Sequence, residues 1–148
     1  DLDLRQDLLL HWAGLDGGDQ QMTDDLRFTR ELIHLRWKFP GLRGNGFRVV
    51  HIHDHNRVLV FHRWVEGVGH DVIVVVHLAH FDRRGYRIGF PGGGSWREIF
   101  NSDVFEVCAD PNLVGNRGEI RADPWPLHDF AYSAEIALPA NSIVVFAR

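Results

Sequence analysis

Three of the ten histidines, His51, His53 and His55, stand at alternate positions. A strand would direct His51 and His53 to the same face, and imidazole is a ligand of zinc, copper and iron. A metal site would need a third ligand and a carboxylate from elsewhere in the chain. Because the turn expected at residues 54–56 interrupts the strand, we expect a solvated hairpin end, with no metal and no cofactor. The histidines that could supply a third ligand are His62, His77 and His80.

The aromatic residues suggest a second kind of chemistry, because exposed aromatic rings stack on the faces of sugars. Trp125 stands between Pro124 and Pro126, in a segment expected to run extended over the surface. Trp96 is a second candidate, although its place in an alternating strand favours the core. Trp125 and Trp96 are therefore the candidate carbohydrate-binding residues. The other rings considered are Trp64, Tyr86 and Tyr132.

Carboxylates could do glycosidic chemistry, which needs two of them on either side of the bond. The aspartates of this chain are scattered among expected turns and helix starts. No Ser/His/Asp grouping stands out, and the glycine run at residues 92–94 precedes a strand rather than the helix of a phosphate-binding loop. We predict no catalytic residue in this chain.

Two helices are expected before the β region. Leu4, Leu8 and Trp12 recur at the spacing of one helical face. The second helix is expected to start at Thr23 as N-cap and to end at Pro40. Its apolar face consists of Phe28, Leu32, Leu35 and Phe39.

From residue 47 onward the pattern is that of strands. Residues 47–53 and 57–64 predict a hairpin, and residues 86–90 and 96–100 predict another around the glycine turn. Residues 132–138 and 142–147 predict a last hairpin. The apolar run at 72–78 indicates a central strand covered on both faces, and residues 105–107 and 119–121 are shorter strands. The fold class is mainly β, an antiparallel β-sandwich of about eight strands preceded by two N-terminal helices. The domains are residues 1–43 and 44–148.

The composition of the chain excludes several classes of protein. The net charge of −4 gives no basic stripe for nucleic acid, and no apolar run reaches the length of a membrane span. The single cysteine, Cys108, indicates a reducing compartment, so we expect a cytoplasmic location. The chain begins at Asp1 and its one methionine is Met22. We therefore expect a processed chain or a piece of a longer one.

Three stretches carry a family resemblance. Residues 86–103 read YRIGFP, a glycine turn, W-R-E and N-S-D. Residues 28–43 contain Leu35-Arg36 and Pro40-Gly41-Leu42, and residues 126–148 close with a leucine-proline and an apolar strand. In this order they resemble the C-terminal domain of 1,4-α-glucan branching enzymes of the α-amylase superfamily. The chain departs from the family at residues 107–111, which read VCADP where relatives often have Tyr-Gly-Gly.

The resemblance implies a non-catalytic domain of a glycosyltransferase of glycogen or starch synthesis, which moves α-1,4-linked glucan to α-1,6 positions. Residues 1–43 would be the end of the catalytic barrel, and the family's catalytic acids would lie upstream of this chain. The implied partners are the barrel of the same parent chain, which the domain would stabilise, and α-glucan. The alternatives are a free-standing carbohydrate-binding module and a metal-binding cupin-like protein.

Overall fold

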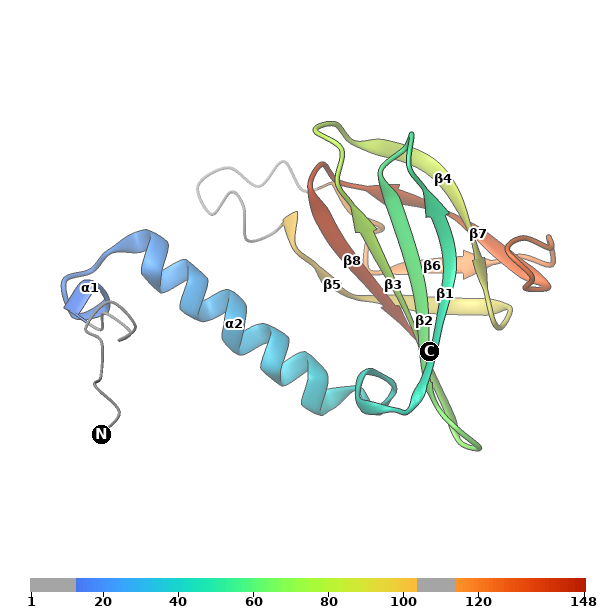
Figure 1. Ribbon diagram of the computed structural model, residues 1–148, viewed down its shortest axis with the longest axis horizontal. Helices are drawn as coiled ribbons and strands as arrows, with labels where there is room; N and C mark the ends of the chain where they lie inside the picture. The colour runs from blue at the N-terminus through green and yellow to red at the C-terminus, as the bar shows by residue number, and fades with distance from the viewer. Residues whose placement is uncertain (1–12, 104–113) are drawn as a thin grey trace, which may run out of the picture. The chain divides into compact units, whose positions relative to one another are not determined.

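The computed structural model describes residues 13–103 and 114–148 (Figure 1). The chain divides into two compact units, with the boundary between Ile33 and His34. The helix predicted over residues 4–12 and the strand predicted at 105–107 lie outside the described residues.

The helical segment consists of α1 (Ala13–Asp16), α2 (Gln20–Lys38) and the 3₁₀ turn η2 (Pro40–Arg43). Asp19 caps α2, because its Oδ1 accepts a hydrogen bond of 3.2 Å from the backbone N–H of Met22. The predicted cap at Thr23 is therefore wrong. The Thr23 hydroxyl lies inside the helix and donates to the carbonyl of Asp19 at 2.9 Å. The end of α2 before Pro40 confirms the predicted stop.

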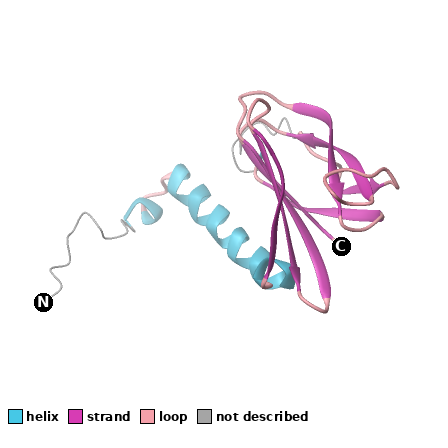
Figure 2. Ribbon diagram, turned by 45° about the vertical axis from the view of Figure 1, so that its right-hand side comes forward, coloured by secondary structure: helices cyan, strands magenta, loops and turns pink. Residues whose placement is uncertain are grey.

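The described residues form eight antiparallel strands in two sheets, which confirms the predicted mainly-β fold (Figures 1 and 2). The larger sheet has the order β1-β2-β3-β8-β5-β6, and the smaller one pairs β4 with β7. The strands are β1 (Gly46–His53), β2 (Val58–Val65), β3 (Gly69–His77), β4 (Arg83–Phe90), β5 (Gly94–Asn101), β6 (Glu119–Ala122), β7 (Tyr132–Leu138) and β8 (Ser142–Ala147).

One hairpin prediction is confirmed and two are wrong. β1 and β2 pair around the turn at residues 54–57, and β3 lies inside the larger sheet between β2 and β8, as its apolar run predicts. β4 and β5, however, belong to different sheets, and so do β7 and β8. Alternation of apolar and polar residues indicates which face of a strand is buried. The alternation is the same whether a strand pairs with the next strand in the sequence or lies opposite it in the other sheet. The glycine turn thus connects two layers instead of closing a hairpin.

The hydrophobic core lies between the two sheets. Trp96 of β5, Phe90 of β4 and Phe146 of β8 are all fully buried. The ring centroids of Phe90 and Trp96 are 5.0 Å apart, and those of Phe90 and Phe146 are 5.8 Å apart. These rings come from both layers, so they hold the sheets together. Aliphatic side chains of β2, β3, β7 and β8 complete the cluster.

Within residues 13–103 and 114–148, we find no helix with both the length and the apolar character that a membrane span requires.

Candidate functional site

Trp125 lies in the loop between β6 and β7, and 62% of its surface is exposed. The guanidinium carbon of Arg87 lies 4.9 Å from the ring centroid, close enough for a cation–π contact. Arg87 is itself fixed by β7, because it donates to Ser133 Oγ and to Glu135 Oε1, both at 3.1 Å. The indole is therefore a supported, solvent-exposed ring, and such a ring can stack on a sugar.

Trp96 has a different environment from the one a sugar contact needs. Its indole is fully buried, and its Nε1–H donates to the carbonyl of Gly92 at 2.8 Å. A ring with no exposed face cannot stack on a sugar. We therefore correct its assignment: Trp96 is a core residue, and the prediction of carbohydrate binding stays with Trp125.

A bulge in β1 between Val49 and His51 turns His51 toward the smaller sheet. His51 Nε2 lies 2.9 Å from the hydroxyl of Tyr86 on β4. Its ring stacks on that of His128 with a centroid distance of 4.1 Å and an angle of 15°. His53 is close as well, with its ring centroid 5.8 Å from that of His51. The spacing in the sequence thus brings two of the three histidines together, and the loop before β7 adds a histidine that the sequence did not indicate.

Three other histidines have different surroundings. His62 Nε2 pairs with Asp71 Oδ1 at 2.7 Å, His77 Nδ1 donates to the carbonyl of Pro139 at 2.6 Å, and His55 is exposed. Among the described residues there is no group of three or more histidine, cysteine or acidic side chains that could hold a metal ion. The structure therefore offers the cupin-like alternative no ligand set in this part of the chain.

Burial lowers the pKa of both stacked histidines, and each is lowered further by a neighbouring imidazole. The pKa of His128 falls to about 4, with burial as the main cause and the charge of His51 as the second. The backbone N–H of Gly89 donates to His128 Nδ1 at 3.2 Å, and only an unprotonated Nδ1 can accept this bond. The fold therefore favours the neutral form of His128.

Stability is expected to decrease as the pH falls from about 6.5 toward about 4. In this window the unfolded chain binds a proton at position 128 that the folded chain excludes, because an unfolded histidine has a pKa of about 6.5. Above that window the proton is absent from both states and the stability is fully retained. His128→Asn should make the thermal midpoint less dependent on pH, and asparagine tolerates the positive φ of 53° at this position. Equal pH dependence in the variant and the parent chain would contradict this assignment.

Several aspartates support the backbone. Asp103 Oδ2 accepts from the N–H of Val114 at 3.1 Å, and Asp82 Oδ1 accepts from the N–H of Ala140 at 3.0 Å. With the hydrogen bond between Asp71 and His62, these contacts account for three of the acids as structural groups.

The outer face of the larger sheet is a feature that the sequence analysis missed. On β2, Val58 and Val60 point into the core, so the alternate residues Leu59 and Phe61 point outward. Register places Val49 opposite Phe61 and Ile52 opposite Leu59, and the rings of Phe47 and Phe61 lie 5.7 Å apart. We call these five residues the outer apolar face: Phe47, Val49, Ile52, Leu59 and Phe61.

The outer apolar face is open to solvent on its β1 side. Phe47 is 58% exposed, Val49 is 44% and Ile52 is 65%. A hollow of about 330 Å³ adjoins it, lined in part by Ile52, Leu59 and Leu78. Contiguous exposed apolar residues of this kind mark interaction surfaces. The signal in the sequence was that the strands at 58–61 and 72–78 are apolar on both faces, where a solvated outer face would alternate with polar residues.

Comparison with known proteins shows the family to which the chain belongs. The family described as "Alpha amylase, C-terminal all-beta domain" matches residues 49–148. The chain is similar to 1,4-alpha-glucan branching enzyme GlgB 1 of Xanthomonas campestris pv. campestris (strain 8004), with 34% identity over 144 residues, 93% of this chain and 19% of that protein. It is also similar to 1,4-alpha-glucan branching enzyme GlgB of Synechococcus sp. (strain JA-2-3B'a(2-13)), with 33% identity over 142 residues, 90% of this chain and 18% of that protein. The chain thus spans about a fifth of the length of these relatives.

Proposed function

Because the chain belongs to the family of α-amylase C-terminal all-β domains, we propose that it is the non-catalytic C-terminal domain of a 1,4-α-glucan branching enzyme. The names of its relatives support this proposal. In it, the parent protein transfers α-1,4-linked glucan to α-1,6 positions in glycogen or starch synthesis, and its catalytic acids lie outside this chain. A change in the iodine staining of amylose caused by the 148-residue chain alone would contradict the non-catalytic role.

The outer apolar face is the observation that carries the proposal, since it suits a domain that packs against a larger partner in the same chain. In this proposal residues 44–148 form the β domain, residues 1–43 end the barrel, and the outer apolar face packs on the barrel and stabilises it. The helix gives further support. Trp37, in the part of α2 that belongs to the same unit as the strands, is 68% exposed, as expected for an apolar helix residue that packs on the barrel in this proposal.

Replacing Phe47 and Ile52 together with serine in the parent enzyme is expected to weaken packing of the domain on the barrel by about 2 kcal/mol, because two exposed side chains would no longer be buried there. Calorimetry of the parent should then show the β domain unfolding at a lower temperature than in the unmodified enzyme. In the 148-residue chain the same change should alter stability by less than about 0.5 kcal/mol, since both side chains are exposed.

Val68 provides the matched control, because it is apolar, 67% exposed and lies in the turn between β2 and β3, outside the set of residues that form the outer apolar face. Val68→Ser should leave the unfolding of the parent unchanged. A parent carrying F47S and I52S that unfolds like the unmodified enzyme would rule out this docking surface.

We also propose that Trp125 contacts α-glucan. Trp125→Ala should weaken binding of the 148-residue chain to glycogen about tenfold, a loss of about 1.4 kcal/mol, measured by affinity electrophoresis in glycogen gels. The control is Trp37→Ala. Trp37 is equally exposed, at 68%, and an arginine, Arg43, lies 5.0 Å from its ring. Equal retardation of W125A and the parent chain would count against the contact.

The same gels distinguish the second candidate, a free-standing carbohydrate-binding module, which the exposed indole of Trp125 favours. Such a module would bind glycogen unaided and would not need the outer apolar face for packing on a barrel, so retardation of the 148-residue chain together with no effect of F47S and I52S on the unfolding of a longer enzyme would favour it. A cytoplasmic location belongs to the first proposal and is supported by the single cysteine of the sequence.

A further inference from the structure

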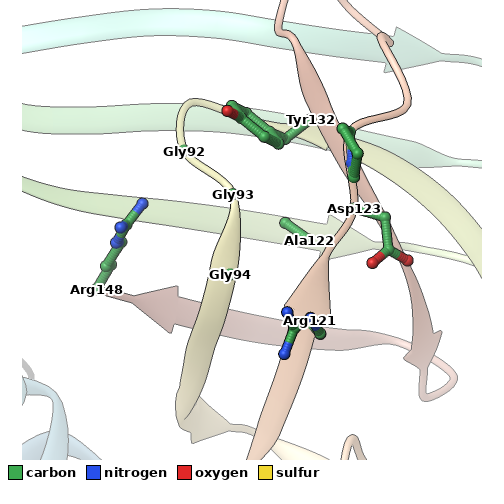
Figure 3. A pocket seen from close by; sticks show the side chains of 9 residues that line it. Gly92, Gly93, Gly94, Arg121, Ala122, Asp123, Tyr132 and Arg148 are labelled. Carbon is green, nitrogen blue, oxygen red and sulfur yellow. The ribbon is translucent and has the colours of Figure 1, made fainter.

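A pocket of about 410 Å³ lies where the turn between β4 and β5 meets the end of β6 and the start of β7 (Figure 3). The turn provides Gly92, Gly93 and Gly94, and the chain end provides Arg148. The remaining lining residues are Arg121, Ala122, Asp123, Pro124 and Tyr132.

The glycines of this turn have no side chains, so the side chains of Tyr132 and Arg148 can lie close to its backbone. A Cβ atom at Gly93 would lie 2.5 Å from the Tyr132 ring, and one at Gly92 would collide with the guanidinium of Arg148. Figure 3 shows the Tyr132 ring beside the turn and the Arg148 side chain reaching toward Gly92. Any larger residue at these two positions would push the ring and the guanidinium out of place. The run of glycines in the sequence therefore shapes the wall of the pocket.

Within the part of the chain that the structure describes, the charged side chains of the pocket form no ion pair or side-chain hydrogen bond. Arg121 and Asp123 lie on either side of the buried Ala122, so both project to the outer side of the strand end. Among residues 13–103 and 114–148, neither of them forms an ion pair or a side-chain hydrogen bond, and the guanidinium of Arg148 forms none either. Two guanidinium groups that can donate and one carboxylate that can accept are thus available to a ligand.

This set of groups suits an uncharged polyhydroxyl ligand better than an anion. Sugar hydroxyls can accept from arginine, donate to a carboxylate and do both with a phenol. An oxyanion would meet two arginines but would also be repelled by Asp123. The volume lies within the range of pockets that hold small organic ligands, and the lining is mainly polar.

The loop that carries the exposed indole of Trp125 follows directly after the residues that line the pocket. Pro124 lines the pocket, and Trp125 is the next residue. A glucan chain that is bound in the pocket and runs along this loop would meet Trp125 with its following units. Two contacts on one chain raise affinity, because the second contact forms at a high effective concentration.

We propose that this pocket is a glucan subsite, in which Arg121, Asp123 and Arg148 bind sugar hydroxyls and Tyr132 forms a wall, with a second contact to the same glucan chain at Trp125. The inference rests on the proposed function for the identity of the ligand. It predicts that affinity increases with chain length, since a short oligosaccharide reaches one contact and a long one reaches both.

The test is titration calorimetry of the 148-residue chain with maltotriose, maltoheptaose and inorganic phosphate. The chain should bind maltoheptaose at least about tenfold more tightly than maltotriose. Arg121→Gln combined with Asp123→Asn should remove most of that difference, and so should W125A. Arg84→Gln is the control, since Arg84 is equally exposed and lies outside the pocket.

Three results would overturn the subsite: no binding of maltoheptaose, equal binding by the chain with R121Q and D123N, or binding of phosphate that these substitutions abolish. None of them bears on the docking of the outer apolar face, which the calorimetry of the parent enzyme tests separately. Thermal unfolding of each variant tests whether it is folded. We expect the variant with R121Q and D123N to be folded, because both substituted side chains are exposed.

Discussion

Replacing Trp96 with alanine is expected to lower the free energy of unfolding of the chain by about 4 kcal/mol. The indole is fully buried, it packs on Phe90 with ring centroids 5.0 Å apart, and its Nε1–H bonds the carbonyl of Gly92 at 2.8 Å. The substitution would leave a large cavity between the sheets and an unpaired carbonyl in the turn that joins them. Urea denaturation followed by circular dichroism measures the loss.

Two further variants separate packing from hydrogen bonding at this position. Trp96→Phe keeps most of the contact with Phe90 and loses the bond to Gly92, so its cost should be about 2 kcal/mol. Trp125→Ala should cost less than about 0.5 kcal/mol, because that indole is 62% exposed. If W96A lowered the free energy of unfolding by less than about 1 kcal/mol, close to the value expected for W125A, the indole of Trp96 would not be packed between the sheets as described.

Replacing Asn116 with alanine is expected to cost about 3 kcal/mol, because this side chain joins the two sheets. Its Oδ1 accepts from the N–H of Ala137 on β7 at 2.7 Å, and its Nδ2 donates to the carbonyl of the same residue at 3.1 Å. The same Nδ2 also donates to the carboxylate of Glu98 on β5. Truncation leaves a backbone N–H and carbonyl of β7 and a carboxylate without these partners, and denaturation in urea measures the cost.

Asn116→Asp tests the direction of these bonds. The aspartate could still accept from Ala137, but it could no longer donate, and it would place a second carboxylate beside Glu98. Its cost should therefore equal or exceed that of N116A. Asn45→Ala is the control, because Asn45 bonds Glu66 at the surface with both partners exposed. Wild-type stability of N116D would show that the link between sheets contributes little.

Much of the candidate site could be predicted locally. The two prolines around Trp125 restrict the backbone and remove N–H donors, so this indole was expected outside the sheets, and the structure places it in an exposed loop. The spacing of His51 and His53 placed both on one side of a strand, and their rings lie close together. His128, which stacks on His51, is 77 positions further along the chain (128 − 51), and nothing local pointed to it.

The pairing of strands could not be predicted in the same way. Residues 86–90 and 96–100 alternate like a hairpin around their glycines, yet β4 pairs with β7 and β5 pairs with β8 and β6. The alternation is satisfied in both arrangements, because Phe90 and Trp96 face the same core from opposite layers. Where strands pair, and whether a turn stays within a layer, depends on contacts between distant segments.

The sequence by itself determined the class of this protein: a helix that stops before Pro40, a β region from residue 47 onward, the alternation of apolar and polar residues along the strands, and the family. These follow from local rules, since side chains alternate along a strand and proline cannot continue a helix. Only the tertiary structure decided which tryptophan is open to a ligand, which strands are neighbours, and that Arg121, Tyr132 and Arg148 surround one glycine turn. Each of these features depends on where distant parts of the chain meet. Long-range contacts compete to decide the meeting points, and this competition leaves no periodic signal in the sequence.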